Sequence, residues 1–119
     1  MSDRELHQRC VYMCDLSNGR RYEEQGIRPC LIISTTEHNM CSDTVIAVPI
    51  TRNISRADKW QSHVKIYNRE HDEVCAMVDH TREVDQSYVM QYMYSLDDAQ
   101  YSKVVEAYLD WIGVITCTE

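Results

Sequence analysis

The chain has 119 residues, of which 44% are hydrophobic and 26% are charged, and its formal net charge is −7. This length suits one modest core, so we expect a single domain over residues 1–119. The acidic balance argues against a general nucleic-acid binder that neutralises phosphates over its whole surface. The chain has no apolar stretch long enough for a membrane span and no apolar secretion signal, which predicts a cytoplasmic protein with no membrane partner.

The charge is unevenly distributed along the chain. Residues 1–67 contain nine Lys and Arg against eight Asp and Glu, a balance of +1, whereas residues 68–119 contain three against eleven, a balance of −8. Within the first part, residues 51–65 carry four basic side chains and one acidic side chain around Trp60. A basic loop with an aromatic ring is typical of a surface that stacks on single-stranded nucleic acid. A solvated surface loop would have the same composition, so both interpretations stay open.

Five segments have the patterns of β-strands. Residues 29–34 and 44–50 are nearly continuous apolar runs with β-branched side chains, which is typical of strands buried on both faces. Residues 11–16 form a short strand that ends at a Ser-Asn-Gly turn, residues 63–67 alternate in polarity, and residues 73–78 form another apolar run. Five strands so close together predict a small, strongly bent sheet or barrel.

The end of the chain changes to a helical period. Apolar residues recur at helical spacing after Ser95, which predicts one amphipathic helix with Ser95 as its N-cap and Gly113 at its end. A shorter helical turn is expected over residues 85–91. The repeating apolar positions are Tyr101, Val104, Val105, Tyr108 and Ile112.

The six cysteines include no C-x-x-C pair, and several lie inside apolar runs. We therefore expect reduced core cysteines rather than a disulfide framework. The histidines do not combine H-x-x-x-H spacing with a third ligand, so the sequence predicts no zinc site and no cofactor.

Three segments match, in order, the motifs of a known family. Residues 22–34 (YEEQGIRPCLIIS) resemble a segment that reads G-S-E-Q-x-G-x-R-P-x-L-I-I, and residues 44–51 (TVIAVPIT) resemble a buried strand that ends in threonine. Residues 78–85 (VDHTREVD) are similar to a D-Q-x-R-x-x-D stretch. These motifs are typical of the MazF/PemK family of toxin endoribonucleases from type II toxin–antitoxin systems, and the resemblance covers residues 8–113.

The resemblance implies a mainly β fold with a C-terminal helix, a CcdB/MazF-type SH3-like β-barrel. It also implies a homodimer that cleaves single-stranded RNA at a short sequence without a metal and is neutralised by a cognate antitoxin protein. The chain departs from the family pattern, and the changes in its loop affect the expected substrate preference. The glycines of the family's loop are largely replaced, by Arg21, Tyr22 and Gln25, and Arg52 follows the threonine where the family has Ser or Thr.

Metal-free RNA cleavage requires a base for the attacking 2′-hydroxyl, an acid for the leaving oxygen and donors for the phosphate oxygens. By resemblance, Arg28 and Thr51 form the phosphate site and Glu23 is the base, with Glu24 in reserve. Asp79 would orient its neighbours rather than do chemistry. The expected RNA-binding residues are Glu24, Gln25, Arg52, Arg56, Lys59, Trp60, Asp79 and His80.

Three other interpretations compete with this one. A pair of histidines can also cleave RNA without a metal, and His63 and His80 are the candidates. A CcdB-like poison of DNA gyrase would use its C-terminal end, and the sequence Trp-Ile-Gly at residues 111–113 is similar to the ending of that branch. A catalytically inactive binding module on the same fold is the third.

Overall fold

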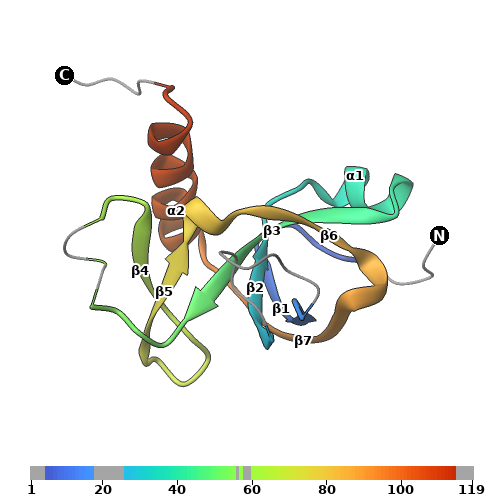
Figure 1. Ribbon diagram of the computed structural model, residues 1–119, viewed down its shortest axis with the longest axis horizontal. Coiled ribbons are helices and arrows are strands. Elements are labelled where there is room, and N and C mark those ends of the chain that lie inside the picture. Colours follow the sequence, from blue (N-terminus) through green and yellow to red (C-terminus); the bar gives the residue numbers. More distant parts are fainter. Residues whose placement is uncertain (1–4, 18–25, 56, 58–59, 115–119) are drawn as a thin grey trace.

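The computed structural model describes residues 5–17, 26–55, 57 and 60–114, and the chain is traced in Figure 1. Seven strands, two α-helices and two 3-10 turns are formed by these residues. In chain order they are β1 (Cys10–Asp15), β2 (Ile27–Ile32), α1 (Thr36–Cys41), β3 (Thr44–Thr51), β4 (His63–Tyr67), β5 (Glu73–Met77), η1 (Val78–His80), β6 (Arg82–Asp85), η2 (Gln86–Tyr88), β7 (Val89–Ser95) and α2 (Asp98–Trp111).

The long strand β3 connects the two halves of an antiparallel sheet. Its first residues pair with β6, its middle pairs with β2, and its last two residues pair with β5. The full strand order is β4-β5-β3-β2-β1-β7, with β6 beside β3. The predicted mainly β fold with a C-terminal helix is confirmed. Within the described residues the two end strands β4 and β7 do not pair, so the sheet is bent but not closed into a barrel.

The apolar side chains of the sheet form two clusters, one on each face. Alternate residues of β1 and β2 enter different clusters: Cys14 and Ile32 pack in the first, and Val11 and Leu31 pack in the second. The second cluster also receives β4, β5 and the helix α2 through Val104. The apolar runs over residues 29–34 and 44–50 are therefore buried on both faces, as their composition predicts. The five described cysteines are free, and all but Cys41 are buried.

The five predicted strands are present: β4 has the predicted bounds, and the bounds of the other four differ by one or two residues. The strands β6 and β7 were not predicted, and the helical turn expected over residues 85–91 is only the three-residue η2 between them. Most residues of β6 and β7 are exposed or half-buried, so their sequences lack a clear apolar pattern. They are extended because they pair with β3 and β1, respectively.

The C-terminal helix begins two residues later than predicted. Asp97, rather than Ser95, is the N-cap of α2, and its carboxylate accepts a hydrogen bond from Gln100 N at 2.8 Å. Ser95 belongs to β7. The predicted end is confirmed, because Gly113 follows the helix with a φ of +91°. Neither described α-helix is long and apolar enough to cross a membrane.

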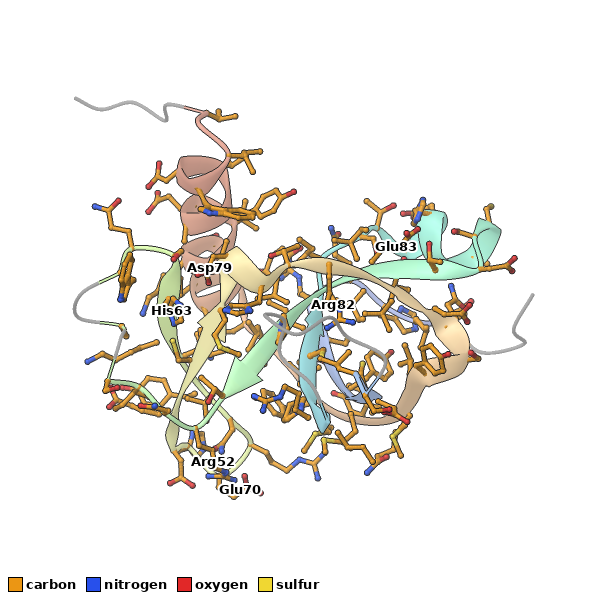
Figure 2. All side chains as sticks on the ribbon, in the orientation of Figure 1. Arg52, His63, Glu70, Asp79, Arg82 and Glu83 are labelled. Carbon is orange, nitrogen blue, oxygen red and sulfur yellow. The ribbon has the colours of Figure 1, made fainter. Side chains whose placement is uncertain are left out.

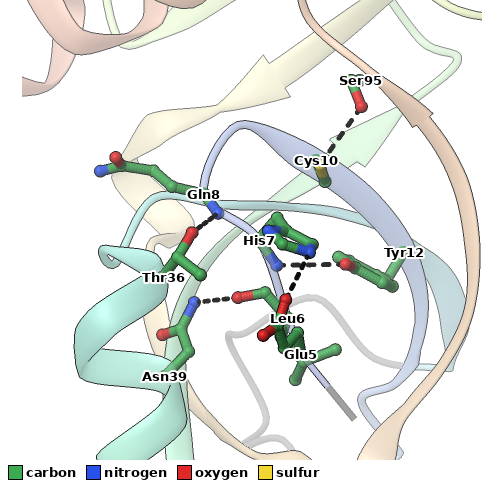
Figure 3. A network of polar contacts seen from close by, with 9 residues as sticks. All are labelled: Glu5, Leu6, His7, Gln8, Cys10, Tyr12, Thr36, Asn39 and Ser95. Atoms are coloured by element: carbon green, nitrogen blue, oxygen red, sulfur yellow. Dashed lines mark hydrogen bonds and ion pairs between the residues drawn. The ribbon is translucent and has the colours of Figure 1, made fainter.

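The short helix α1 was not predicted, and it anchors the N-terminal segment (Figure 3). Thr35 is its N-cap. The buried Asn39 side chain donates to Leu6 O at 2.7 Å and accepts from Ser34 Oγ at 2.6 Å. The hydroxyl oxygen of Thr36 accepts from the backbone N of residue 8 at 3.1 Å. These contacts satisfy buried polar groups, which explains why a polar residue occupies the core side of the helix.

Candidate active site

The two residues of the expected phosphate site lie on neighbouring strands. The β2–β3 register pairs Leu31 with Val48 and Cys30 with Pro49. Arg28 and Thr51 each lie two residues beyond the last of these pairs, at the same end of the two strands.

Arg28 and Thr51 both line one cavity of about 450 Å³. The cavity lies where the ends of β2 and β3 meet β7 and the β4–β5 loop. Three arginines and one glutamate line it, so its described walls are positively charged although the chain is acidic. Its lining residues are Arg28, Pro29, Ile50, Thr51, Arg52, Asn68, Arg69, Glu70, Val74, Gln91, Tyr92, Met93 and Tyr94.

Hydrogen bonding prepares Thr51 to act as a donor. Its Oγ1 accepts a hydrogen bond from Asn53 N at 3.1 Å, so the hydroxyl proton can be donated to a ligand oxygen. The neighbouring Arg52 is largely exposed, with Nη1 3.8 Å from Asp72 Oδ2. This loose surface ion pair can exchange for a contact with an anionic ligand.

The loop between β4 and β5 adds a carboxylate to the cavity. Asn68 organises the loop, because its Oδ1 accepts from the backbone N of Glu70 at 3.0 Å and of Asp72 at 2.9 Å. Figure 2 shows Glu70 beside Arg52 at this end of the molecule. The sequence motifs do not include Glu70. The signal that could have identified it is the hairpin over residues 63–78, whose second strand pairs with Thr51.

Two tyrosines of β7 complete the walls. Burial raises the pKa of Tyr94 to about 12, and the negative charge of Glu70 adds to the rise, while Arg52 opposes it. Tyr94 is therefore a neutral hydroxyl at physiological pH, able to donate a hydrogen bond but not to act as a base. The Tyr92 ring is 52% exposed and packs edge-on against Tyr12 with centroids 5.8 Å apart, which leaves it accessible to a stacking partner.

The cavity brings together only some of the residues that the sequence selects. It contains Arg28, Thr51 and Arg52, whereas Trp60, Asp79 and His80 do not line it. The assignment of these last three to RNA binding stays a prediction. Five further predicted residues lie outside the described part of the chain: Glu23, Glu24, Gln25, Arg56 and Lys59.

The candidate histidine pair lies at a different place. The rings of His63 and His80 have centroids 6.3 Å apart, and both side chains are near Asp79. Figure 2 shows His63 and Asp79 beside α2, away from Arg52 and Glu70. The structure therefore assembles the two histidines, but outside the cavity of Arg28 and Thr51.

Comparison with known proteins identifies the family of the chain. Residues 7–111 match the family model described as the PemK-like, MazF-like toxin of type II toxin–antitoxin systems. The chain belongs to this family. The match includes both Arg28 and Thr51, and it does not favour the alternatives of a CcdB-like gyrase poison or an inactive binding module.

Relatives of the family support the same assignment. The chain is 36% identical over 101 residues to the endoribonuclease EndoA of Bacillus subtilis. The aligned region covers 82% of this chain and 85% of EndoA. Two solved structures share the fold. MazF from Deinococcus radiodurans has a TM-score of 0.80 at 18% identity, covering 93% of this chain and 99% of that one. A mycobacterial endoribonuclease in complex with its cognate antitoxin has a TM-score of 0.76 at 20% identity, covering 94% and 99%.

Proposed function

We propose that the protein is a metal-independent endoribonuclease that cleaves single-stranded RNA by attack of a 2′-hydroxyl on the adjacent phosphate. The observation that carries the proposal is the convergence of Arg28 and Thr51 on one positively charged cavity. The cavity is large enough for a phosphate and parts of its neighbouring nucleotides. Membership of a toxin family and the endoribonuclease name of the EndoA relative support the same activity.

Arg28 would stabilise the transition state. As the 2′-oxygen attacks, negative charge accumulates on the phosphate oxygens, and a guanidinium can donate two parallel hydrogen bonds to them. Arg28 would also deliver the proton to the leaving 5′-oxygen. The Thr51 hydroxyl and the neutral Tyr94 hydroxyl would add two uncharged donors on the same walls.

The base would be a carboxylate. By the family motif it is Glu23, with Glu24 as the reserve. Glu70 is a carboxylate on the described wall of the cavity, so it is the competing candidate for the base. A carboxylate surrounded by arginines stays ionised and can accept the 2′-hydroxyl proton, although the positive charge makes it a weaker base.

RNA bases would be held by aromatic and polar side chains around the phosphate. The exposed Tyr92 ring offers a stacking surface within the cavity, and base–aromatic stacking is tolerant of sequence. The altered loop around residues 21–25 would set the sequence preference. The active form would be a cytoplasmic homodimer, and a cognate antitoxin protein would bind and neutralise it. One structural neighbour is an endoribonuclease in complex with its cognate antitoxin, which supports such a partner.

The experiment is RNA cleavage by the purified protein in excess EDTA. We expect products that end in a 2′,3′-cyclic phosphate and a 5′-hydroxyl, because the attacking oxygen belongs to the RNA itself. Arg28→Ala should lower the rate by a hundredfold to a thousandfold, about 2.7–4 kcal/mol of transition-state stabilisation. Arg28→Lys should restore part of the rate, since lysine keeps the charge without the planar fork.

The matched control is Arg9→Ala. Arg9 forms an ion pair with Asp98 and does not line the cavity, so its loss should leave cleavage unchanged. Circular dichroism should show that all three variants are folded. Cleavage that depends on added metal, or an Arg28→Ala variant with the wild-type rate, would contradict the proposal.

A further inference from the structure

Three potential metal ligands converge at the end of the β4–β5 hairpin that is remote from the cavity. His63 is the first residue of β4, and Asp79 and His80 belong to η1, directly after β5. The antiparallel register pairs His63 with Met77, so the beginning of β4 lies beside the end of β5. One ligand atom from each of the three residues lies within 4.8 Å of the other two.

The distances suit a small cation. His63 Nε2 lies 3.1 Å from Asp79 Oδ1, and His80 Nε2 lies 3.9 Å from the same oxygen. The two imidazole rings meet at an interplanar angle of 86°. Tetrahedral zinc with ligands at about 2.0–2.2 Å separates its ligand atoms by about 3.3–3.6 Å. Small side-chain rotations would therefore bring all three residues to bonding distance of one ion.

The three side chains differ in their exposure to solvent. His63 is 4% exposed, His80 is 20% exposed and Asp79 is 33% exposed. A cation would enter past Asp79 and His80 and reach an imidazole nitrogen of His63 at the base of the site. His63 Nδ1 is buried and has no hydrogen-bond partner among the described residues, so the contact at Nε2 is its principal polar anchor. A missing outer partner typically weakens metal binding by about 10–100-fold.

We propose that His63, Asp79 and His80 form a binding site for a divalent transition-metal cation of the zinc type. Two imidazoles and one carboxylate favour Zn²⁺, Co²⁺ or Ni²⁺ over Mg²⁺ and Ca²⁺, which prefer oxygen ligands. Three protein ligands leave a fourth position for water. The ion would link β4 to η1, and α2 packs against both of these elements.

The cation site is separate from the cavity of Arg28 and Thr51. His63 is the first residue of β4, and the cavity wall includes Asn68, just beyond the last residue of this strand. The length of β4 is roughly 13 Å for an extended strand. In Figure 2, His63 and Asp79 lie together at one place, and Arg52 and Glu70 lie together at another. The proposed ion therefore lies outside the cavity of Arg28 and Thr51, and its binding can be measured whatever the catalytic activity of the chain.

The test is calorimetric titration of the metal-free protein with zinc chloride, with the melting temperature measured in parallel. We expect one site in the wild type and a melting temperature that rises with zinc, because an ion that binds only the folded state stabilises it. His80→Gln and Asp79→Asn each remove one of the three ligands. Each should weaken zinc binding by at least about 100-fold, the upper end of the loss seen for outer-shell changes. His63→Gln should do the same, and if this buried substitution prevents folding, the other two variants decide the result.

The matched control is His38→Gln. His38 is exposed in α1, one helical turn from the exposed Cys41, so these two residues could hold zinc adventitiously. His38→Gln should leave the calorimetric site and the thermal shift unchanged. Bound Co²⁺ should give a tetrahedral spectrum without a thiolate charge-transfer band. Absence of zinc binding, wild-type affinity in His80→Gln and Asp79→Asn, loss of the site in His38→Gln, or a thiolate band would each overturn the proposal.

Discussion

Individual side chains of the cavity combine charge with neutral donors. Arg28, Arg52 and Arg69 make it positive within a chain whose net charge is −7, so the site attracts phosphate where the rest of the surface repels it. Thr51 and Tyr94 add uncharged donors. Three carboxylates are candidates for the base. The family motif selects Glu23 and Glu24, whereas the position of Glu70 on the cavity wall selects the third.

The first prediction separates these three carboxylates. Glu23→Gln should lower the single-turnover rate of RNA cleavage by about 10²–10⁴-fold, the usual contribution of a general base. Glu70→Gln should change the rate much less, because removing its negative charge only makes the cavity more positive. The rates are measured under saturating RNA in EDTA, with Glu24→Gln as the third arm. A loss confined to Glu70→Gln would transfer the role of base to Glu70, and a loss confined to Glu24→Gln would indicate a one-residue shift in the loop.

Secondary-structure elements position these side chains through two kinds of contact. Strand pairing fixes the cavity, because β3 is shared by β2, β5 and β6 and so determines where Thr51 lies relative to Arg28. Polar anchoring fixes the short helix α1. The buried Gln86 side chain donates to Asn39 O at 2.7 Å and to Ser42 O at 2.9 Å, so η2 and the N-terminal segment both attach to this helix.

The second prediction concerns this anchor. Asn39→Ala removes the amide that bonds Leu6 O and Ser34 Oγ, and leaves the carbonyl of the buried Leu6 without this donor. The free energy of unfolding should fall by about 1–3 kcal/mol. Urea denaturation measures the change, with Glu37→Ala on the exposed face of the same helix as the control, expected within about 0.5 kcal/mol of wild type. Equal stabilities for Asn39→Ala and Glu37→Ala would show that the network adds nothing to the fold.

At the scale of the whole molecule, the sheet ends in an edge with exposed apolar side chains. Within the described residues β7 pairs with β1 on one side only, and Met90 and Tyr92 on this strand are 39% and 52% exposed. Ile27, at the beginning of β2, is 58% exposed. Exposed strand edges and apolar surface favour association with a second copy. Both features agree with the homodimer expected from the family.

The third prediction is therefore the mass in solution. Light scattering of the purified protein at micromolar concentration should give twice the 14.0 kDa mass of one chain. Two identical protomers related by a twofold axis are the commonest assembly of soluble proteins and bury the same edge on each. Only a 14 kDa species across the concentration series would rule out the dimer.

The sequence alone determined the strands whose burial leaves a clear pattern and the motif that carries the chemistry. Residues 29–34 and 44–50 are apolar on both faces because both faces are covered, so their composition predicts their position. Arg28 and Thr51 could be selected from the family motif before any geometry was known. The end of α2 was also predictable, because Gly113 has the positive φ that favours glycine.

Tertiary structure decided what depends on partners distant in the sequence. The exposed strands β6 and β7 are extended because they pair with β3 and β1, and Ser95 is a strand residue for the same reason. Glu70 reaches the cavity because β5 pairs with the end of β3, and His63 meets Asp79 and His80 because β4 runs antiparallel to β5. A rule based on spacing between histidines detects ligands on one helix. It does not detect ligands assembled by a β-hairpin, because their distance in space is set by the pairing register rather than by their separation along the chain.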